Sequence, residues 1–342
     1  MATRKRTPQG PAQDAPAPPP LRFPEIRGHD EPIAFLRRAW KGRRLAHAYF
    51  FTGPAGIGKL AAARALALGT HCDETPFDAC GNCEACRTIA AGTHADVRVV
   101  FGPVKDKRDI SIEQVRGLQR ELGFRSMSDH PKVGIINDAH LLTNQAQNAL
   151  LKMLEEPSGD SLLILVGVNA ATLTPTILSR CQRVRFGPIA PGEVAAILEA
   201  HGHKRAEATA LAAYADGSPG RALTLDRTFF TTGRPAILQR LASLRGAGFK
   251  QLSDVAQELA TGEQELGLVM TVIASWYRDG LRRQLLGSDE PIQNTDLSDA
   301  LPRIDVDSSL RNLETTYATM VALRQNANRN LALTKLLLTL AR

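Results

Sequence analysis

Residues 48–68 read AYFFTGPAGIGKLAAARALAL, and this stretch decides the fold of the chain. A short, largely apolar run is followed by a glycine-rich loop and then by an alanine- and leucine-rich segment with helical character. The loop fits the GxxxxGK pattern from Gly53 through Gly58 to Lys59, in which main-chain N–H groups and a helix amino terminus bind phosphate. Such a loop between a strand and a helix predicts a phosphate-binding α/β domain.

Apolar runs on either side of helical patterns extend this prediction along the chain. The runs that predict further strands are VRVVF (97–101), KVGIIN (132–137), SLLILVG (161–167) and RVRF (183–186). Strands that alternate with helical crossovers form a parallel sheet. We therefore expect an α/β domain over residues 23–188.

Strand patterns stop after Pro191, and the remaining sequence is helical in pattern. We expect a small helical domain over residues 189–230 and a second helical domain over residues 231–342. Two apolar stripes of helical spacing mark the second domain: Leu310, Leu313, Tyr317 and Val321, and then Leu333, Leu336, Leu337 and Leu340. The sequence leaves open whether these stripes close a core within the chain or pack against a partner.

The amino terminus has the composition of a flexible arm. Six of the first 20 residues are proline, so we expect residues 1–22 to remain without a packed core. No secretory-type apolar segment follows the basic residues Arg4, Lys5 and Arg6, and no apolar run reaches the length of a membrane helix. We expect a cytoplasmic protein. The net charge of +7 suits a polyanion such as nucleic acid, although the arm supplies three of the positive charges.

The nucleotide site lacks the oxygens that bind magnesium. Leu60 follows Lys59, where a working loop has Ser or Thr. The strand near 132–136 ends in the amide of Asn137, a poorer magnesium ligand than a carboxylate, and Asp138 follows it. We expect weak or absent ATP binding and no ATPase activity of the chain alone. The residues of this vestigial site are Gly53, Gly58, Lys59 and Asp138.

Four of the five cysteines lie together with C-x7-C-x2-C-x2-C spacing: Cys72, Cys80, Cys83 and Cys86. Two overlapping C-x2-C steps let thiolates converge on one ion, and four cysteine ligands without an open position predict structural zinc. Zinc would order this module, at about residues 71–87, without a core of its own. An iron–sulfur cluster, a redox pair and unligated thiols are the alternatives. No other sequence feature indicates electron transfer, and a redox pair leaves two cysteines unexplained.

The stretch TPTILSRCQRVRF (174–186) contains a Ser-Arg-Cys motif that resembles the motif of clamp-loader subunits, within the AAA+ ATPase class. Other stretches are similar to the bacterial subunits of that group: the cysteine insertion, NALLKMLEEP (148–157), GSPGRAL (217–223) and NANRNLALTKLLL (326–338). The altered magnesium positions resemble those of the delta-prime subunits of the DNA polymerase III clamp loader, not those of the ATP-hydrolysing gamma/tau subunits. In an alignment without gaps, Val168 and Gly220 replace the usual sensor residues of the family.

The resemblance implies an AAA+ domain, a helical lid domain over 189–230 and a helical collar domain over 231–342. It also implies that Arg180 acts in trans, as an arginine finger for ATP on a neighbouring gamma/tau subunit. The alternative for Arg180 is that it merely pairs with a local carboxylate. The implied partners are gamma/tau and delta subunits, with the sliding clamp and primed DNA reached through the complex of a DNA-directed DNA polymerase. The alternatives are a competent ATPase motor that uses Lys59 in cis, and a zinc-dependent DNA-binding protein.

Overall fold

The computed structural model describes residues 22–104, 107–157, 159–261, 266–287, 292–301 and 304–341. Of the predicted arm, residues 1–21 lie outside these ranges. The chain divides into two compact units, one of residues 1–193 and 218–220 and the other of residues 194–217 and 221–342. The division into domains at 23–188, 189–230 and 231–342 stays a prediction.

The first unit contains a five-stranded parallel sheet with the order β2-β3-β4-β1-β5. Its strands are β1 (Ala48–Thr52), β2 (Val97–Val100), β3 (Lys132–Ile136), β4 (Ser161–Gly167) and β5 (Gln182–Arg185). Its helices are α1 (Asp30–Lys41), α2 (Lys59–His71), α3 (Glu84–Ala90), α4 (Ile112–Gly123), α5 (Asn144–Glu155) and α6 (Pro175–Leu178), with short 3-10 helices η1 (Phe23–Glu25), η2 (Ala139–Leu141) and η3 (Ala170–Thr172). The predicted α/β domain with a parallel sheet is confirmed.

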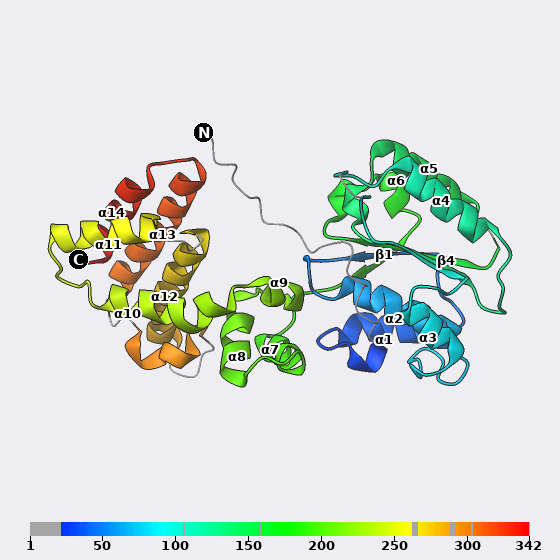
Figure 1. Cartoon of the computed structure of the whole chain (residues 1–342), viewed down its shortest axis with the longest axis horizontal. Coiled ribbons are helices and arrows are strands. Elements are labelled where there is room, and N and C mark those ends of the chain that lie inside the picture. The colour runs from blue at the N-terminus through cyan, green and yellow to red at the C-terminus, as the bar shows by residue number, and fades with distance from the viewer. Residues whose placement is uncertain are drawn as a thin grey trace. The chain divides into compact units, whose positions relative to one another are not determined.

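The sheet separates two apolar cores, because successive side chains of a strand point to opposite faces. In β1, Tyr49 and Phe51 pack into the core with α1, α2 and α3, whereas Ala48 and Phe50 pack into the core with α4, α5 and α6. Figure 1 shows these two sets of helices on opposite sides of β1 and β4. The sheet is thus covered on both faces, and its carboxyl edge is left for the phosphate loop.

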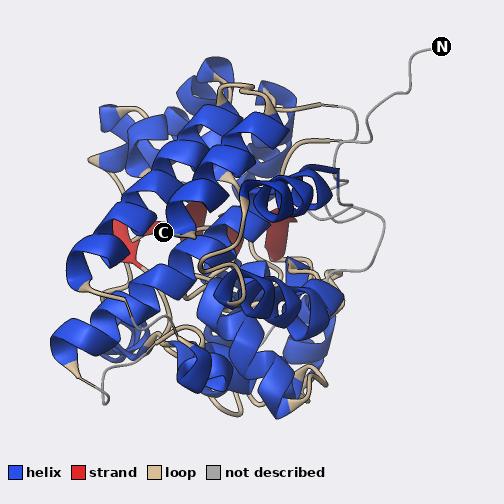
Figure 2. Ribbon diagram, turned by 90° about the vertical axis from the view of Figure 1, so that its left-hand side faces the viewer, coloured by secondary structure: helices blue, strands red, loops and turns tan. Residues whose placement is uncertain are grey.

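The second unit is helical throughout its described residues. Its helices are α7 (Pro191–Ala200) and α9 (Pro219–Thr224), which both start in the first unit, α8 (Arg205–Tyr214), the π-helix η4 (Phe229–Gly233), α10 (Arg234–Ala242), α11 (Phe249–Thr261), α12 (Leu266–Leu286), η5 (Thr295–Ala300), α13 (Val306–Arg324) and α14 (Arg329–Leu340). In Figure 2 the strands, coloured red, are confined to the sheet of the first unit. Among the described residues, no helix is both long and apolar enough to cross a membrane.

The two apolar stripes of the second unit face in different directions. The stripe on α14 is buried: Leu333, Leu336, Leu337 and Leu340. On α13, by contrast, Leu310, Tyr317 and Val321 are 42%, 42% and 52% exposed. The buried residues of α13 are Ser309, Asn312, Thr316 and Thr319. The α14 stripe therefore closes the core of this unit, and α13 presents an exposed apolar face formed by Leu310, Tyr317 and Val321.

Asn294 forms a buried polar hub between α8, α10 and α12. Its side-chain oxygen accepts hydrogen bonds from the hydroxyl of Tyr214 at 2.7 Å and from Nη1 of Arg234 at 2.8 Å. Its side-chain nitrogen donates to Ser275 Oγ at 3.1 Å and to Asp279 Oδ2 at 2.8 Å. Because both polar atoms of the amide are satisfied, the hub joins α8 of the predicted lid to α10 and α12 of the predicted collar.

Asp96 is a buried carboxylate just before β2. It accepts hydrogen bonds from the hydroxyls of Ser126 and Ser128 at 2.9 and 3.0 Å and from the amide of Met127 at 3.1 Å, and it pairs with Lys132 Nζ at 3.1 Å. Burial alone would raise the pKa of Asp96, but these donors hold it well below the usual range of an aspartate. The charged side chain therefore stabilises the turn that leads into β3.

Replacement of Asp96 by asparagine should lower the free energy of unfolding at pH 7 by about 3–5 kcal/mol, because Lys132 would remain buried without its charge partner. The pKa of Asp96 is lower in the folded state than in the unfolded state, so its contribution is complete above pH ~4 and is lost as the pH falls further. Urea denaturation from pH 7 to pH 3 measures both effects. The variant should lose stability less steeply in acid than the parent chain.

The matched control is Asp129→Asn, since Asp129 is exposed in the same turn. This change should alter the free energy of unfolding by less than about 0.5 kcal/mol. Equal losses in the two variants would show that Asp96 has no special role.

Candidate functional site

The phosphate loop joins β1 to α2 and is shaped by its glycines. Gly53, Gly56 and Gly58 have φ angles of +152°, +73° and +103°, in the region that L residues rarely adopt. A Cβ atom at Gly53 would lie 2.1 Å from the main-chain oxygen of Phe186. The loop backbone therefore passes directly against the chain that follows β5, and only glycine fits there.

Lys59 begins α2, and its ammonium group is bound by its own loop. The Nζ atom donates to the main-chain oxygens of Gly53 at 2.8 Å and Pro54 at 2.5 Å. Burial lowers the pKa of Lys59 to about 8, and the charge of Asp138 opposes this shift. The loop thus supplies acceptors to the lysine that a bound phosphate would otherwise supply.

The two altered magnesium positions are used for packing and for a local hydrogen bond. The side chain of Leu60 packs against the apolar core and offers no oxygen. The side chain of Asn137 donates to Asp138 Oδ2 at 2.9 Å. Burial raises the pKa of Asp138, although His140 and Lys59 oppose the shift. The charge of Asp138 thus acts on Lys59, but the chain has no carboxylate at position 137 and no hydroxyl at position 60.

Two residues of the GSPGRAL stretch contact the phosphate loop. Ser218 Oγ donates to the main-chain oxygen of Ala55 at 2.9 Å. The amide N–H of Gly220 donates to the main-chain oxygen of Gly56 at 2.8 Å. A Cβ atom at Gly220 would lie 2.8 Å from the Cα atom of Gly56. Any larger residue at Gly220 would collide with the loop.

The position expected for the first sensor also lacks a polar side chain directed at a nucleotide. Val168 is 36% exposed at the end of β4. Asn169 follows it, and its side-chain oxygen accepts a hydrogen bond from the amide of Ala171 at 2.9 Å. The Asn169 side chain therefore caps η3.

His29 contacts the loop in a way that no sequence pattern predicts. The ring is buried, and its Nε2 atom lies 2.5 Å from the main-chain oxygen of Ile57. Burial lowers the pKa of His29, so the ring is neutral at pH 7 and Nε2–H donates to this oxygen. His29 therefore fixes the loop through a single hydrogen bond.

The four predicted metal ligands converge on one point. The Sγ atoms of Cys72, Cys80, Cys83 and Cys86 all lie within 4.8 Å of one another. The Cys80–Cys86 and Cys72–Cys83 sulfur pairs are 4.0 Å apart. Tetrahedral zinc with Zn–S bonds of ~2.3 Å places its sulfur atoms roughly 3.8 Å apart, so the arrangement fits a metal ion of this size.

Main-chain N–H groups around the cysteines suit sulfur atoms in their charged form. The amides of Thr75 and Cys80 point at Cys72 Sγ at 3.3 and 3.2 Å, and those of Asn82 and Cys83 point at Cys80 Sγ at 3.4 and 3.2 Å. Such donors stabilise thiolates, which are the form that binds metal. The donor chemistry and the geometry therefore agree.

Arg180 lies between α6 and β5. Apart from its contact with the adjacent Ser179, its side chain makes two polar contacts. Its Nη2 atom pairs with Glu155 Oε1 at 3.0 Å, and Nη1 donates to the main-chain oxygen of Thr176 at 3.0 Å. The side chain is 35% exposed. The guanidinium is therefore held at the surface of the first unit.

The sheet places Arg180 away from the phosphate loop of the same chain. β5 pairs with β1 in parallel, with Tyr49 opposite Gln182 and Thr52 opposite Arg185. Arg180 precedes the first of these pairs, at the amino edge of the sheet, whereas the loop follows Thr52 at the carboxyl edge. The two candidate groups therefore lie at opposite edges of one sheet.

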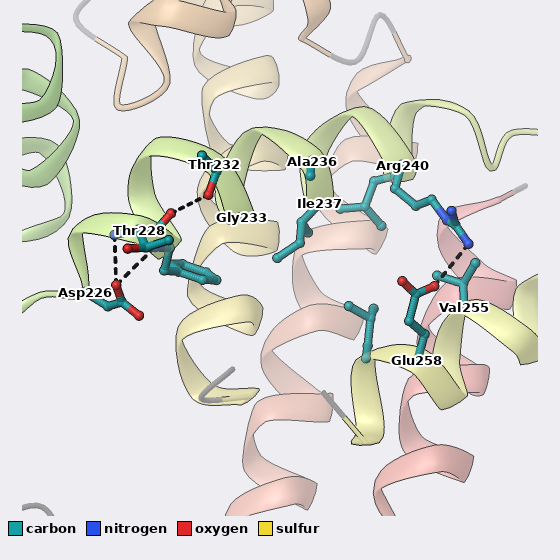
Figure 3. Close-up of a pocket in the computed structure, with 12 residues that line it drawn as sticks. Asp226, Thr228, Thr232, Gly233, Ala236, Ile237, Arg240, Val255 and Glu258 are labelled. Carbon is teal, nitrogen blue, oxygen red and sulfur yellow. Dashed lines mark hydrogen bonds and ion pairs between the residues drawn. The ribbon is translucent and has the colours of Figure 1, made fainter. Parts of the chain in front are cut away.

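A groove in the second unit carries none of the predicted site residues. It has a volume of about 660 Å³ and is lined by residues of η4, α10 and α11. Figure 3 shows Ile237 and Val255 along the groove and the Arg240–Glu258 ion pair, 3.1 Å long, at one end. The residues that line the groove therefore include no residue of the phosphate loop or the cysteine cluster, and they do not include Arg180.

Comparisons with known proteins match this chain to subunits of DNA polymerase III. The family model described as "DNA polymerase III, delta subunit" matches residues 28–190. The delta′ subunit of DNA polymerase III from Pseudomonas aeruginosa is 32% identical over 255 residues, which cover 74% of this chain and 76% of that protein.

Two Bacillus subtilis proteins match over shorter stretches. The delta′ subunit is 36% identical over 148 residues, 43% of this chain and 44% of that protein. The tau subunit is 32% identical over 168 residues, 49% of this chain and 29% of that protein. The matched part of this chain thus spans less than half the length of both Bacillus relatives.

Purified chain should contain one zinc ion per molecule, measured by elemental analysis. Cys83→Ser should lose most of this zinc, because three thiolates and a hydroxyl bind the ion more weakly than four thiolates. A chelator should lower the thermal unfolding midpoint of the parent chain, since metal binding is coupled to folding. Cys181→Ser is the matched control, because Cys181 lies outside the cluster, and it should retain the ion. Iron in place of zinc, or no metal in freshly purified chain, would contradict the assignment.

Proposed function

Because the chain belongs to the family of delta′ subunits of the DNA polymerase III clamp loader, we propose that it is a non-hydrolysing subunit of that loader. In this role it scaffolds the complex with gamma/tau and delta subunits and donates Arg180 to ATP bound on a neighbouring gamma/tau subunit. The sliding clamp and primed DNA are reached through the assembled complex. The separation of Arg180 from its own phosphate loop, at opposite edges of the sheet, carries this proposal.

The absence of hydrolysis by the chain itself is supported by the site at the carboxyl edge. Leu60 has no oxygen for magnesium, and Asn137 offers an uncharged amide that is bonded to Asp138. Without a metal ion, charge that develops on the transferred phosphoryl group is poorly stabilised. The retained Lys59 gives at most weak ATP binding, because it is already satisfied by its own loop.

A role for Arg180 in trans is supported by its chemistry and its exposure. A guanidinium is permanently charged and planar, so it can bind two phosphate oxygens and stabilise charge in the transition state. Arg180 is 35% exposed and is held by weak surface contacts. A triphosphate that reaches it must come from another chain, since the phosphate loop of this chain lies at the other edge of the sheet.

The cysteine cluster and the helical domains have structural parts in this proposal. Zinc bound by the four cysteines orders the module between α2 and α3 and supplies no chemistry. In this proposal residues 189–230 form a lid domain and residues 231–342 form a collar domain. The exposed apolar face of α13 is the surface on which the collar packs against a neighbouring subunit.

The second candidate is a gamma/tau-like ATPase motor that acts in cis. The similarity to the Bacillus subtilis tau subunit and the retained Lys59 favour it. The residues at positions 60 and 137 oppose it, and so does the hydrogen bond of Gly220 to the phosphate loop at the place of the usual arginine. The non-hydrolysing subunit therefore explains more of the site.

The chain should co-elute in size-exclusion chromatography with gamma/tau and delta subunits, as should its Arg180→Ala variant. ATP turnover of the complex, measured with clamp and primed DNA, should fall by at least tenfold at the ATP site that Arg180 completes. Arginine fingers of other nucleotide hydrolases contribute ~10³–10⁵ in rate, and the other sites of the ring limit the total loss.

Arg183→Ala is the matched control, because Arg183 is an exposed arginine on the adjacent strand β5. It should leave turnover unchanged. Full turnover with Arg180→Ala in an assembled complex would rule out the role of Arg180 as a finger. Failure of the parent chain to assemble would rule out the loader role itself.

A further inference from the structure

Glu155 contacts the candidate finger from a different part of the chain. It is the last residue of α5, 25 positions before Arg180, and belongs to the NALLKMLEEP stretch. Its Oε1 atom lies 3.0 Å from Nη2 of Arg180. The other terminal nitrogen, Nη1, donates to the main-chain oxygen of Thr176 at 3.0 Å. Both terminal nitrogens of the guanidinium are therefore engaged within the subunit.

A carboxylate and a phosphate bind a guanidinium in the same way. The two oxygens of a carboxylate, or two of the tetrahedral oxygens of a phosphate, can accept two N–H groups of the arginine fork. The Nη2 N–H group that donates to Glu155 is not available to a phosphate oxygen of another chain. A carboxylate that stayed beside the arginine would also repel the triphosphate. An incoming phosphate must therefore displace Glu155.

We propose that Glu155 is a positioning residue that holds the Arg180 guanidinium as a placeholder anion and is exchanged for the triphosphate of the neighbouring subunit. This inference rests on the proposed role of Arg180 as a finger in trans. Glu155 itself touches no nucleotide. The contact to the Thr176 oxygen, which belongs to the same short segment as Arg180, keeps the guanidinium oriented while the anion changes.

The exposure of the pair makes such an exchange feasible. The side chains of Arg180 and Glu155 are 35% and 48% exposed, so water and salt weaken their attraction. Exposed ion pairs change equilibria by up to about fivefold, which is small beside the effect of a finger on hydrolysis. The pair is thus strong enough to fix a long side chain in the free subunit and weak enough to yield to a triphosphate.

The test uses the complex of the chain with gamma/tau and delta subunits, with MgATP as the varied substrate. Glu155→Gln keeps the shape of the side chain and removes its charge. It should lower KM for ATP about two- to fivefold and leave kcat unchanged, because Arg180 no longer has to break an ion pair before it binds the triphosphate. A variant that merely disturbed the fold would lower kcat or reduce assembly.

Two further variants isolate the contact. Glu156→Gln removes the neighbouring charge, which is exposed and follows the end of α5, and should leave KM as in the parent. In the Arg180→Ala background, Glu155→Gln should have no further effect, since the double-mutant cycle measures only the coupling of the two side chains. Thermal unfolding midpoints of the variants should match their respective parents.

The outcomes separate this inference from the proposed function. If Arg180→Ala lowers turnover but Glu155→Gln equals the parent, the placeholder role is wrong and the finger stands. A fall in kcat with Glu155→Gln, or an effect of equal size without Arg180, also overturns the placeholder role. If Arg180→Ala itself leaves turnover unchanged, the proposed function fails first.

Discussion

Lys59 places a buried positive charge at the amino end of α2, where the helix dipole is also positive. In a working phosphate loop this charge is balanced by the oxygens of the bound phosphate groups. Here the carbonyl oxygens of Gly53 and Pro54 accept its N–H groups, and burial lowers its pKa to about 8. The loop thus satisfies its own lysine without a ligand.

The residues around this loop contact other parts of the same chain and offer few ligands for a metal-bound triphosphate. His29 bonds to the Ile57 oxygen, and the amide of Gly220 bonds to the Gly56 oxygen. Leu60 adds apolar packing where a hydroxyl would bind magnesium. The parallel sheet then separates this quiet edge from Arg180, which lies before β5. In the proposed function, the chain therefore does not hydrolyse ATP itself but contributes the Arg180 guanidinium to the ATP site of a neighbouring subunit.

Local patterns predicted much of this structure, because they depend on residues close in sequence. The strand–loop–helix order around Lys59 and the convergence of the four cysteines are of this kind. The direction of the α13 stripe is not, since helical spacing defines a face but not what covers it. Leu310 is exposed and Thr316 is buried only because α12 and α14 pack on the polar side of α13. The Glu155–Arg180 pair likewise depends on how α5 and α6 pack.

In the proposed function, the nucleotide site of this chain does not turn over ATP. The most direct measurement is phosphate release by the isolated, zinc-loaded chain with MgATP, compared with the same chain carrying Lys59→Ala. Equal rates at the background of the assay are expected, because the loop binds no magnesium-bound triphosphate. Magnesium-dependent release that disappears in the Lys59→Ala chain would contradict it.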